Sequence, residues 1–449
     1  MLELEDDAGR ARPASHTAVI GGGLLGMTIA LRLANARRTV TLIESAPELG
    51  GLATAWEIGG VTWDRYYHVM LESDDSLRGL LTELGLADDV RWTTTRTAFF
   101  TDGRLHEFSG VLDFLRFKPL KLHEKLRLGL AIAYASRLTD GKKLEGITAR
   151  AWLTKLCGAR VYAAIWQPLL RAKVGAREAD VSAAFIWAII RRLYGARSAQ
   201  SKAERFGYVS GGYGHIVRRF AERLQELGVT VQTATRVHEI APTVSGVAVT
   251  LADGSTAFYD EVILTAPAPV VASIVPNLSD GERERLNRIA YGGIVCASVL
   301  LDVPLSPHYV TNITDTWVPF TAVISMNAIV DAETFGGRQL VYLPKYVTPD
   351  DPLFEHSDEA IRARFLPALV RMHPHLRPEH VRAFRVSRTR SVFPVTTLNY
   401  SENVLPFASS IPGLWIVNAS QIINGTLAVN QTVGLADRAT AEILAAVGA

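Results

Sequence analysis

The sequence predicts an α/β fold with two interleaved domains, one Rossmann-like and the other a mixed sheet with a helical cap. Three observations predict this arrangement. Residues 16–44 read as a strand, a glycine turn, a helix and a second strand. Residues 112–193 carry apolar side chains at intervals of three and four, which is typical of helices. Strand-like segments return after residue 204, so a long helical block interrupts the α/β pattern.

Three glycines of the first turn have separate mechanical roles. Gly21 permits a tight turn, Gly23 lets the backbone approach a pyrophosphate, and Gly26 lets the next helix pack closely on the strand. That helix begins at Leu24 and Leu25, where unpaired N–H groups and the helix dipole favour phosphate. This order of elements predicts a dinucleotide site. The alternative is an ordinary glycine-rich turn between a strand and a helix.

An acidic residue at the end of the second strand strengthens the prediction. Glu44, followed by Ser45, lies roughly 20 residues beyond the turn, where an acid accepts hydrogen bonds from a ribose 2′-hydroxyl. The charge of Glu44 disfavours a 2′-phosphate at the same place. Because the strand, the turn, the helix and the acid are all present, the sequence favours the nucleotide site over the ordinary turn.

The composition narrows the class of protein. The chain has 449 residues, of which 48% are hydrophobic and 20% charged, and its net charge is only +2. These values are typical of a globular protein and lack the polybasic signal of nucleic-acid binding. Cys157 and Cys296 are far apart and form no C-x-x-C pair. We therefore expect buried apolar thiols, and no disulfide framework, thiol redox centre or metal site.

Two further patterns concern location. No run of about 18 uncharged apolar residues occurs, so we expect no transmembrane helix. Residues 1–15 lack the basic start and apolar core of a secretory signal and read as a loose tail. A cytoplasmic location is the resulting expectation.

Turn and periodicity signals place the remaining elements. Asp102-Gly103 predicts a hairpin over 98–107, and Asp253-Gly254 predicts a second one over 246–259. Strands are also expected at 230–240, 261–266, 293–301, 339–347, 381–395 and 413–418, and helices at 77–86, 212–227, 358–372 and 431–447. We expect one domain to combine residues 1–70, 204–269 and 402–449, and the second to combine 71–203 and 270–401.

Five segments in this order resemble the flavin-dependent amine oxidase superfamily, over nearly the whole chain. They are the glycine turn with Glu44, the run Glu48–Ala55, the run Trp63–His68, the segment Tyr208–Gly212 with Thr235–Ile240, and the run Pro412–Gln421 with Gly425–Gly434. The superfamily includes protoporphyrinogen oxidases, phytoene desaturases and, more distantly, UDP-galactopyranose mutases.

The resemblance implies non-covalently bound FAD in a Rossmann-like domain of the glutathione reductase type. The double glycine Gly50-Gly51 would lie along the FAD pyrophosphate, a feature that domains binding only NAD do not need. Trp63–His68 would pass beside the isoalloxazine ring, and the backbone of Val237 would face adenine. The implied cofactor contacts are Gly21, Gly23, Leu24, Leu25, Gly26, Glu44, Ser45, Gly50, Gly51, Leu52, Ala53, Tyr67, His68, Val237, Ala266, Asn418, Ser420 and Asn430.

The chain departs from the superfamily pattern in the closing flavin motif. Asn418-Ala419 stands where monoamine oxidases have Gly-Glu, so a ribityl-binding carboxylate is missing. Asn418 or Ser420 would supply polar contacts instead. A pair of tyrosines like the aromatic cage of amine oxidases cannot be assigned from the sequence. Both departures disfavour a simple monoamine substrate.

Three residues are candidates for catalysis, although flavin chemistry needs few protein groups because the ring itself takes a hydride. His68 is a candidate contact to the flavin edge, or else a hydrogen-bonding residue that fixes its loop. Lys345 would hold a water near flavin N5, as in amine oxidases, or is a solvated surface lysine. Arg390, with Arg385 and Arg388, would grip an anionic substrate, or lies on a solvated strand face.

The helical block leaves two interpretations open. Residues 115–134 are basic and then apolar, a pattern of helices that lie on a membrane surface, and also of a cap helix whose apolar face is core. Trp152, Trp166 and Trp187 would line an apolar substrate cavity or pack in the core, and core packing is favoured.

The sequence therefore predicts an FAD-dependent oxidoreductase that takes a hydride from a carbon of a small-molecule substrate. A flavin-dependent mutase acting on a nucleotide sugar is the alternative, with the arginines binding its diphosphate. A flavoprotein without turnover is the third interpretation. The substrate, the electron acceptor and the oligomeric state stay open.

Overall fold

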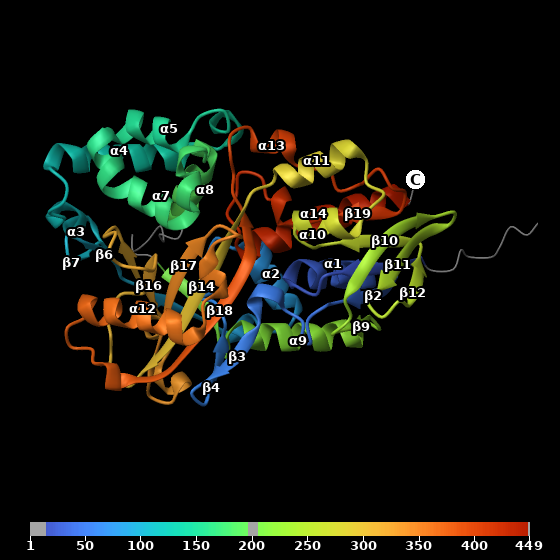
Figure 1. Cartoon of the computed structure of the whole chain (residues 1–449), viewed down its shortest axis with the longest axis horizontal. Coiled ribbons are helices and arrows are strands. Elements are labelled where there is room, and N and C mark those ends of the chain that lie inside the picture. The colour runs from blue at the N-terminus through green and yellow to red at the C-terminus, as the bar shows by residue number, and fades with distance from the viewer. Residues whose placement is uncertain (1–14, 196–204, 448–449) are drawn as a thin grey trace, which may run out of the picture.

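A five-stranded parallel sheet forms the centre of the first domain (Figure 1). The computed structural model describes residues 15–195 and 205–447, so most of the tail expected at 1–15 lies outside the described residues. The strands are β1 (His16–Ile20), β2 (Thr39–Ile43), β9 (Thr230–Gln232), β13 (Glu261–Leu264) and β19 (Leu414–Ile416). They lie in the order β19-β13-β1-β2-β9, and every pairing is parallel.

Different elements cover the two faces of this sheet. Helices α1 (Leu24–Asn35), α2 (Asp75–Glu83), α9 (Gly212–Glu226) and α14 (Val429–Val447) form an apolar core with one face. The other face packs on the antiparallel sheet β10 (Val237–Thr243), β11 (Gly246–Leu251) and β12 (Thr256–Tyr259), and on α10 (Ala268–Ile274). Helix α11 (Asp280–Arg288) and the short α13 (Tyr400–Asn403) complete this layer.

One expected strand is divided in the structure. The run 230–240 forms β9 in the parallel sheet and then β10 in the antiparallel sheet. Ala234, between them, has a positive φ of 52°, which breaks the extended backbone. The apolar alternation continues through this bend, so the pattern alone did not show that the chain changes sheets.

A seven-stranded mixed sheet forms the second domain, in the order β18-β14-β17-β16-β15-β6-β7. Its strands are β6 (Thr97–Thr101), β7 (Arg104–Glu107), β14 (Tyr291–Leu301), β15 (Val310–Ile313), β16 (Ala322–Ser325), β17 (Gln339–Val347) and β18 (Val381–Pro394). Helix α12 (Asp358–Met372) packs on one face. The hairpin β3 (Ala55–Ile58) and β4 (Val61–Asp64) packs on the other face, and β5 (Val90–Thr94) pairs with β8 (Arg205–Val209) nearby.

The helical block forms a cap at one end of the mixed sheet (Figure 1). Its helices are α3 (Val111–Arg116), α4 (Leu122–Arg137), α5 (Ala149–Cys157), α6 (Ala159–Val161), α7 (Gln167–Val174) and α8 (Ala183–Gly195). Trp152, Trp166 and Trp187 are at most 9% exposed and belong to the cap core, as expected. Cys157 and Cys296 are free and buried.

Candidate functional site

The carboxyl ends of the five parallel strands meet at one edge of the sheet. The first residues beyond the strands continue the backbone ladder: Val417 N–H donates to Leu264, Thr265 N–H to Ile20, Gly21 N–H to Ile43 and Glu44 N–H to Gln232, at 2.8–2.9 Å. The glycine turn, the acid and the closing motif are therefore neighbours in space. Ligands of open α/β sheets bind outside this edge.

Two of the turn glycines are required by the fold itself. A Cβ on Gly26 would lie 1.9 Å from the Gly21 carbonyl oxygen, so only glycine lets α1 approach the turn. Gly21 has a φ of +110°, and a Cβ there would lie 2.3 Å from Thr265 Oγ1. The sequence did not single out Thr265, whose hydroxyl donates to the Ile20 carbonyl and so closes the turn.

The third glycine borders open space, as a ligand-facing position should. Gly23 has a φ of −72°, and the nearest atom to a Cβ on it is the Gly51 Cα at 4.0 Å. Gly50 N–H donates to the Gly22 carbonyl at 2.8 Å, which holds the double glycine against the turn. Among the described residues no side chain caps α1, so its first N–H groups are free for an anion.

Glu44 holds the turn as well as ending β2. Its Oε2 accepts from Gly22 N–H at 2.6 Å, and its Oε1 accepts from Ala46 N–H at 2.7 Å and from Ser45 Oγ at 3.2 Å. The carboxylate is partly exposed, and Oε2, which accepts a single hydrogen bond, retains acceptor capacity. The position of the carboxylate therefore suits a ribose hydroxyl. Glu44 also fixes the backbone of Gly22, a structural role that the sequence did not predict.

The closing motif offers an unpaired donor at Asn418. This residue is 1% exposed, and its Oδ1 accepts from Ser420 N–H at 3.0 Å and from Ser420 Oγ at 2.6 Å. Within the described parts of the chain its Nδ2 is buried without a partner. A buried amide donor is costly unless a ligand or water accepts from it. The cofactor predicted at this edge fits that requirement, although the Gly-Glu carboxylate of monoamine oxidases is absent.

The other residues predicted to contact the cofactor lie around the same edge, and one of them, Asn430, has a structural role. Leu24, Leu25 and Ala53 are buried, and Leu52 and Ala266 are partly buried. Val237 begins β10. It lies close in sequence to Thr235, whose N–H donates to the Glu44 carbonyl. Asn430, at the start of α14, uses its Oδ1 to accept from Leu77 N–H at 3.0 Å. Asn430 therefore anchors α2, a structural role that the sequence did not predict.

His68 lies in a buried cluster at the start of α9. Asp64 Oδ1 accepts from Tyr213 N–H at 2.8 Å and from Gly214 N–H at 3.3 Å, and so caps that helix. His68 Nδ1 lies 3.9 Å from Asp64 Oδ2, and the His68 and Tyr213 rings are 4.7 Å apart. Burial raises the pKa of the Asp64 carboxyl above its ordinary value, and the nearby His68 opposes that shift in part.

Two tyrosines meet where the parallel-sheet domain faces the mixed sheet. The Tyr67 and Tyr346 hydroxyls lie 2.6 Å apart. Burial, followed by the neighbouring Tyr346, raises the pKa of Tyr67 well above its ordinary value, so this phenol stays protonated. Lys173 of the cap places its Nζ 3.6 Å from the centre of the Tyr346 ring and 4.8 Å from that of Phe393. The sequence missed Tyr346 and Lys173.

The structure does not bring Lys345 and Arg390 to this place. Side chains alternate along β17, so Tyr342 and Tyr346 face Asp64 and Tyr67 while Lys345 faces α12. Burial, and then the charge of Arg364, lowers the pKa of Lys345, with Asp351 opposing the shift. Neither residue contacts the tyrosine pair, since Arg390 stacks on Phe354 and pairs with Glu355.

The three arginines of β18 do not form one cluster either. Arg388 and Arg390 point to the α12 face, and Arg388 pairs with Asp358 at 2.8 Å. Arg385 points to the opposite face, where it donates to the Glu57 carbonyl at 2.7 Å and stacks on Trp56. Each guanidinium is therefore engaged within the protein, and the predicted anion grip is not assembled.

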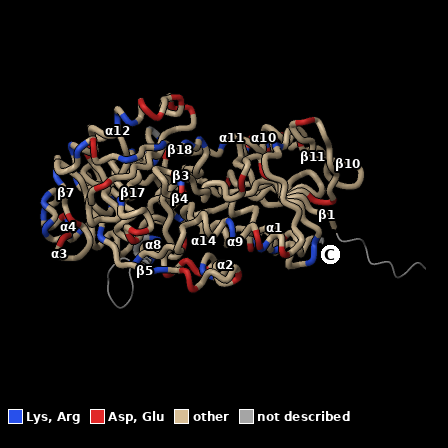
Figure 2. Tube along the Cα trace, turned by 90° about the horizontal axis from the view of Figure 1, so that it is seen from below, with Lys and Arg blue, Asp and Glu red and all other residues tan. Residues whose placement is uncertain are grey.

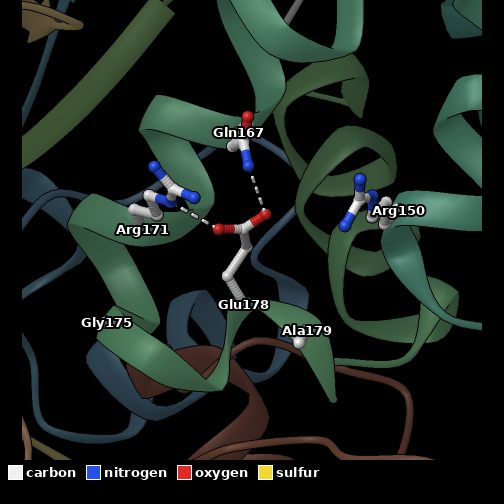
Figure 3. A pocket seen from close by; sticks show the side chains of 6 residues that line it. All are labelled: Arg150, Gln167, Arg171, Gly175, Glu178 and Ala179. Atoms are coloured by element: carbon white, nitrogen blue, oxygen red, sulfur yellow. Dashed lines mark hydrogen bonds and ion pairs between the residues drawn. The ribbon is translucent and has the colours of Figure 1, made fainter. Parts of the chain in front are cut away.

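Two pockets lie outside the predicted site. One of about 370 Å³ is lined by residues of the cap, among them Arg150, Gln167, Arg171 and Glu178. Figure 3 shows Arg150 and Arg171 on opposite sides of Glu178, which accepts from Arg171 Nε at 2.6 Å and from Gln167 at 3.0 Å. A second pocket of about 340 Å³ lies between β5, β8 and the segment 329–334. Neither includes a residue predicted for cofactor binding or catalysis.

Comparison with known proteins agrees with this geometry. The sequence model of flavin containing amine oxidoreductases matches residues 26–426. The chain belongs to this family. It is therefore a flavin-dependent oxidoreductase, and the family and α/β fold predicted from the sequence are confirmed.

Individual relatives are distant. The 15-cis-phytoene desaturase of Narcissus pseudonarcissus is 20% identical over 81% of this chain, a match that spans 67% of that desaturase. A putative protoporphyrinogen oxidase from Exiguobacterium has a similar fold, with a TM-score of 0.76 and 18% identity over 96% of this chain and 99% of that one. A reduced UDP-galactopyranose mutase has a TM-score of 0.74 and 14% identity, over 96% of each chain. At these identities the solved structures show the fold alone.

The described residues contain neither a membrane-spanning helix nor a metal-binding cluster. No helix in residues 15–195 and 205–447 combines the length and apolar content needed to cross a membrane. The same residues contain no group of three or more side chains arranged to hold a metal ion.

Proposed function

We propose that this flavin-dependent oxidoreductase uses non-covalent FAD and takes a hydride from a substrate carbon, as in the amine oxidase and protoporphyrinogen oxidase type. The observation that carries the FAD assignment is the close approach of the Gly23 and Gly51 backbones, beside the uncapped start of α1. Two phosphates need close backbone approach and unpaired N–H groups, and this place supplies both. FAD would contribute an isoalloxazine ring that accepts the hydride.

The residues of the chain divide into holding and positioning roles. Glu44 would accept from the adenine ribose, and the buried Asn418 Nδ2 would donate to the flavin half of the cofactor. Tyr67, with His68 beside it, lies in the run that the family places next to the ring. Tyr346 and Lys173 would form the substrate side of the same space. Tyr346 contacts Tyr67 directly, and Lys173 lies over the ring of Tyr346. A protonated Tyr67 donates a hydrogen bond and does not act as a base.

Reconstitution followed by anaerobic reduction tests this proposal. The purified chain is incubated with FAD, passed through a desalting column and scanned for bound-flavin absorbance. Candidate substrates of the amine, porphyrinogen and polyene classes are then added without oxygen. Bleaching of the flavin by one class supports hydride transfer, whereas a chain that retains no flavin contradicts the proposal.

The alternative of a nucleotide-sugar mutase can be separated in the same experiment. A mutase turns over only after its flavin has been reduced, and a sugar nucleotide would not bleach the oxidised flavin. The arginines of β18 are engaged within the protein, so the diphosphate site of this alternative has less support than the flavin oxidoreductase. A flavin spectrum unchanged by every class, with no turnover after reduction, would instead indicate a flavoprotein without catalysis.

A further inference from the structure

The cap carries an unusual row of exposed apolar side chains on its outer surface. Fifteen large apolar side chains are exposed among the described residues, and eight of them fall within residues 105–134. On α4 they are Leu122, Leu126, Leu130 and Tyr134, which are 51–72% exposed. Their spacing of four residues places them along one side of the helix. On and next to α3 the others are Leu105, Val111, Leu112 and Leu115, at 41–71% exposed.

The same helix is also apolar on its inner side. Leu128, Ala131 and Ala135 are at most 7% exposed and belong to the cap core, and Trp187 Nε1 of α8 donates to the Ala135 carbonyl at 3.0 Å. Core packing therefore accounts for one side of α4 and leaves the row at 122, 126, 130 and 134 unexplained. A helix with apolar side chains on two sides, as α4 has beyond its charged first turn, is normally covered on both. Exposed apolar surface of this extent marks an interaction site.

Unpaired cations lie on the same elements as this row. Residues 104–137 contain seven Lys or Arg and three Asp or Glu. Lys118, Lys121, Arg104 and Arg116 are exposed, and their side chains form no hydrogen bond or ion pair with any residue in the described parts of the chain. Figure 2 shows Lys and Arg along β7, α3 and α4 at this end of the molecule.

The three acids of this segment are already engaged. Glu124 pairs with Arg160 and accepts from Lys121 N–H at 2.7 Å. Asp113 accepts from Gly110 N–H at 3.0 Å, and Glu107 lies 3.8 Å from Arg96. The surface is thus apolar in its centre and positively charged around it.

We propose that this surface, formed by α3, α4 and β7, docks onto an anionic lipid bilayer. Interfacial helices bury a row of large apolar side chains below the headgroups while flanking Lys and Arg contact anionic lipid. A second copy of the chain fits less well. An isologous dimer would place the surface against itself and bring the free cations of both copies together. The proposal is independent of the flavin reaction, because docking requires neither cofactor nor turnover.

Sedimentation of the full chain with vesicles tests the proposal. Vesicles of phosphatidylcholine with about 30% phosphatidylglycerol are compared with phosphatidylcholine alone. We expect the protein to pellet with the anionic vesicles near 0.05 M salt and to be released substantially near ~0.5 M salt, because salt screens the headgroup attraction. Protein that stays in the supernatant with anionic vesicles at low salt overturns the proposal.

The apolar row is tested by the triple change Leu122→Ser, Leu126→Ser and Leu130→Ser. We expect partitioning onto anionic vesicles to fall at least about tenfold, since apolar burial in the interface is lost. The matched control is Val244→Ser with Phe258→Ser, which removes two exposed apolar side chains, 109% and 69% exposed, from the hairpin region of the other domain. The control should partition like the unchanged protein. Equal loss in both variants would contradict a defined docking surface.

The exposed lysines are tested in a separate variant. The proposal can then still be tested if the leucine variant does not fold. Lys118→Glu with Lys121→Glu should lower partitioning about tenfold or more at low salt and have little effect at high salt. Arg285→Glu with Arg362→Glu makes the same charge change at exposed sites elsewhere and is the control. Sedimentation velocity without lipid shows the oligomeric state. A dimer that the leucine change dissociates would assign the surface to a second copy and overturn the proposal.

Discussion

The Tyr67 and Tyr346 hydroxyls lie 2.6 Å apart although the two residues are 279 positions apart in the chain. Tyr67 belongs to the run that follows β4, and Tyr346 to β17 of the mixed sheet. This contact joins the loop that the family places beside the flavin to the sheet that would face the substrate. Lys173 over the Tyr346 ring adds the cap to the same junction.

The change Tyr346→Phe should destabilise the protein without loss of flavin. It removes the partner of a buried hydroxyl, which costs about 1 kcal/mol of unfolding free energy. Urea unfolding measures the cost, and absorbance of the desalted protein measures retained flavin. The matched control is Tyr309→Phe, because Tyr309 is 3% exposed and its hydroxyl has no partner within the described residues. A control as unstable as Tyr346→Phe would show that the tyrosine contact contributes nothing.

The change Gly23→Ala should remove flavin and leave the fold intact. A Cβ there meets no protein atom closer than 4.0 Å, but it occupies the space that the pyrophosphate needs. We expect FAD affinity to fall about tenfold or more, with the free energy of unfolding of the cofactor-free chain changed by less than about 1 kcal/mol.

Two other glycines make this result interpretable. Gly79→Ala, in the exposed part of α2, has no atom within 4 Å of the new Cβ and should be neutral or stabilising. Gly26→Ala places a Cβ 1.9 Å from the Gly21 carbonyl oxygen and should prevent stable folding. If Gly23→Ala binds FAD normally, the pyrophosphate does not lie at this turn.

The change Glu44→Gln should affect both stability and cofactor affinity. Both carboxylate oxygens accept from backbone N–H groups. In glutamine the side-chain NH2 group would replace one oxygen and face a backbone N–H, so that hydrogen bond would be lost. We expect a loss of about 1–3 kcal/mol in unfolding free energy and about tenfold weaker FAD binding, measured by urea unfolding and calorimetric titration. Glu48→Gln, which breaks an exposed ion pair with Arg65, is the control. Lower stability with unchanged affinity would limit Glu44 to holding the loop.

Stability should fall in mild acid because of His373, at the end of α12. Burial, followed by the neighbouring His375 and His308, lowers the pKa of His373 to about 4 from an ordinary 6.5. The unfolded chain therefore binds a proton that the native chain does not, and unfolding becomes easier as the pH falls from 6.5 toward 4. The difference corresponds to about 3 kcal/mol across this window.

Urea unfolding at several pH values checks this dependence. His373→Gln should flatten the pH profile between 6.5 and 4, with a smaller slope remaining because burial also lowers the pKa of His308. His238→Gln, at an exposed histidine, should leave the profile unchanged. A steep profile in the His373 variant would place the acid sensitivity elsewhere.

The sequence predicted the strand, glycine turn and helix at the edge of the parallel sheet well, because their signals are local. The roles of Gly21 and Gly26 depend on a few neighbouring residues, and the structure shows the steric reason for each. The hairpin at Asp102-Gly103 has the positive φ angles, +55° and +70°, that its sequence predicted. The division of 230–240 between two sheets was missed, because one residue with positive φ leaves no mark on the apolar pattern.

The substrate side could not be predicted in the same way. Lys345 and Tyr346 are adjacent, and side-chain alternation puts them on opposite faces of β17. Because β17 is largely buried on both faces, the sequence does not show which face meets the parallel-sheet domain. Lys173 approaches Tyr346 from a helix of the cap, a contact between distant segments that no local spacing encodes.

The order of strands in the parallel sheet has a consequence for synthesis of the chain. The edge strand β19 is formed by Leu414–Ile416 and pairs with β13, and α14 (Val429–Val447) packs on α1, which is made about 400 residues earlier. The apolar surface of the earlier segments therefore stays uncovered during synthesis until residues 414–447 have been made. A chain made without residues 414–447 would therefore be a substrate for chaperones and proteases rather than a smaller working enzyme.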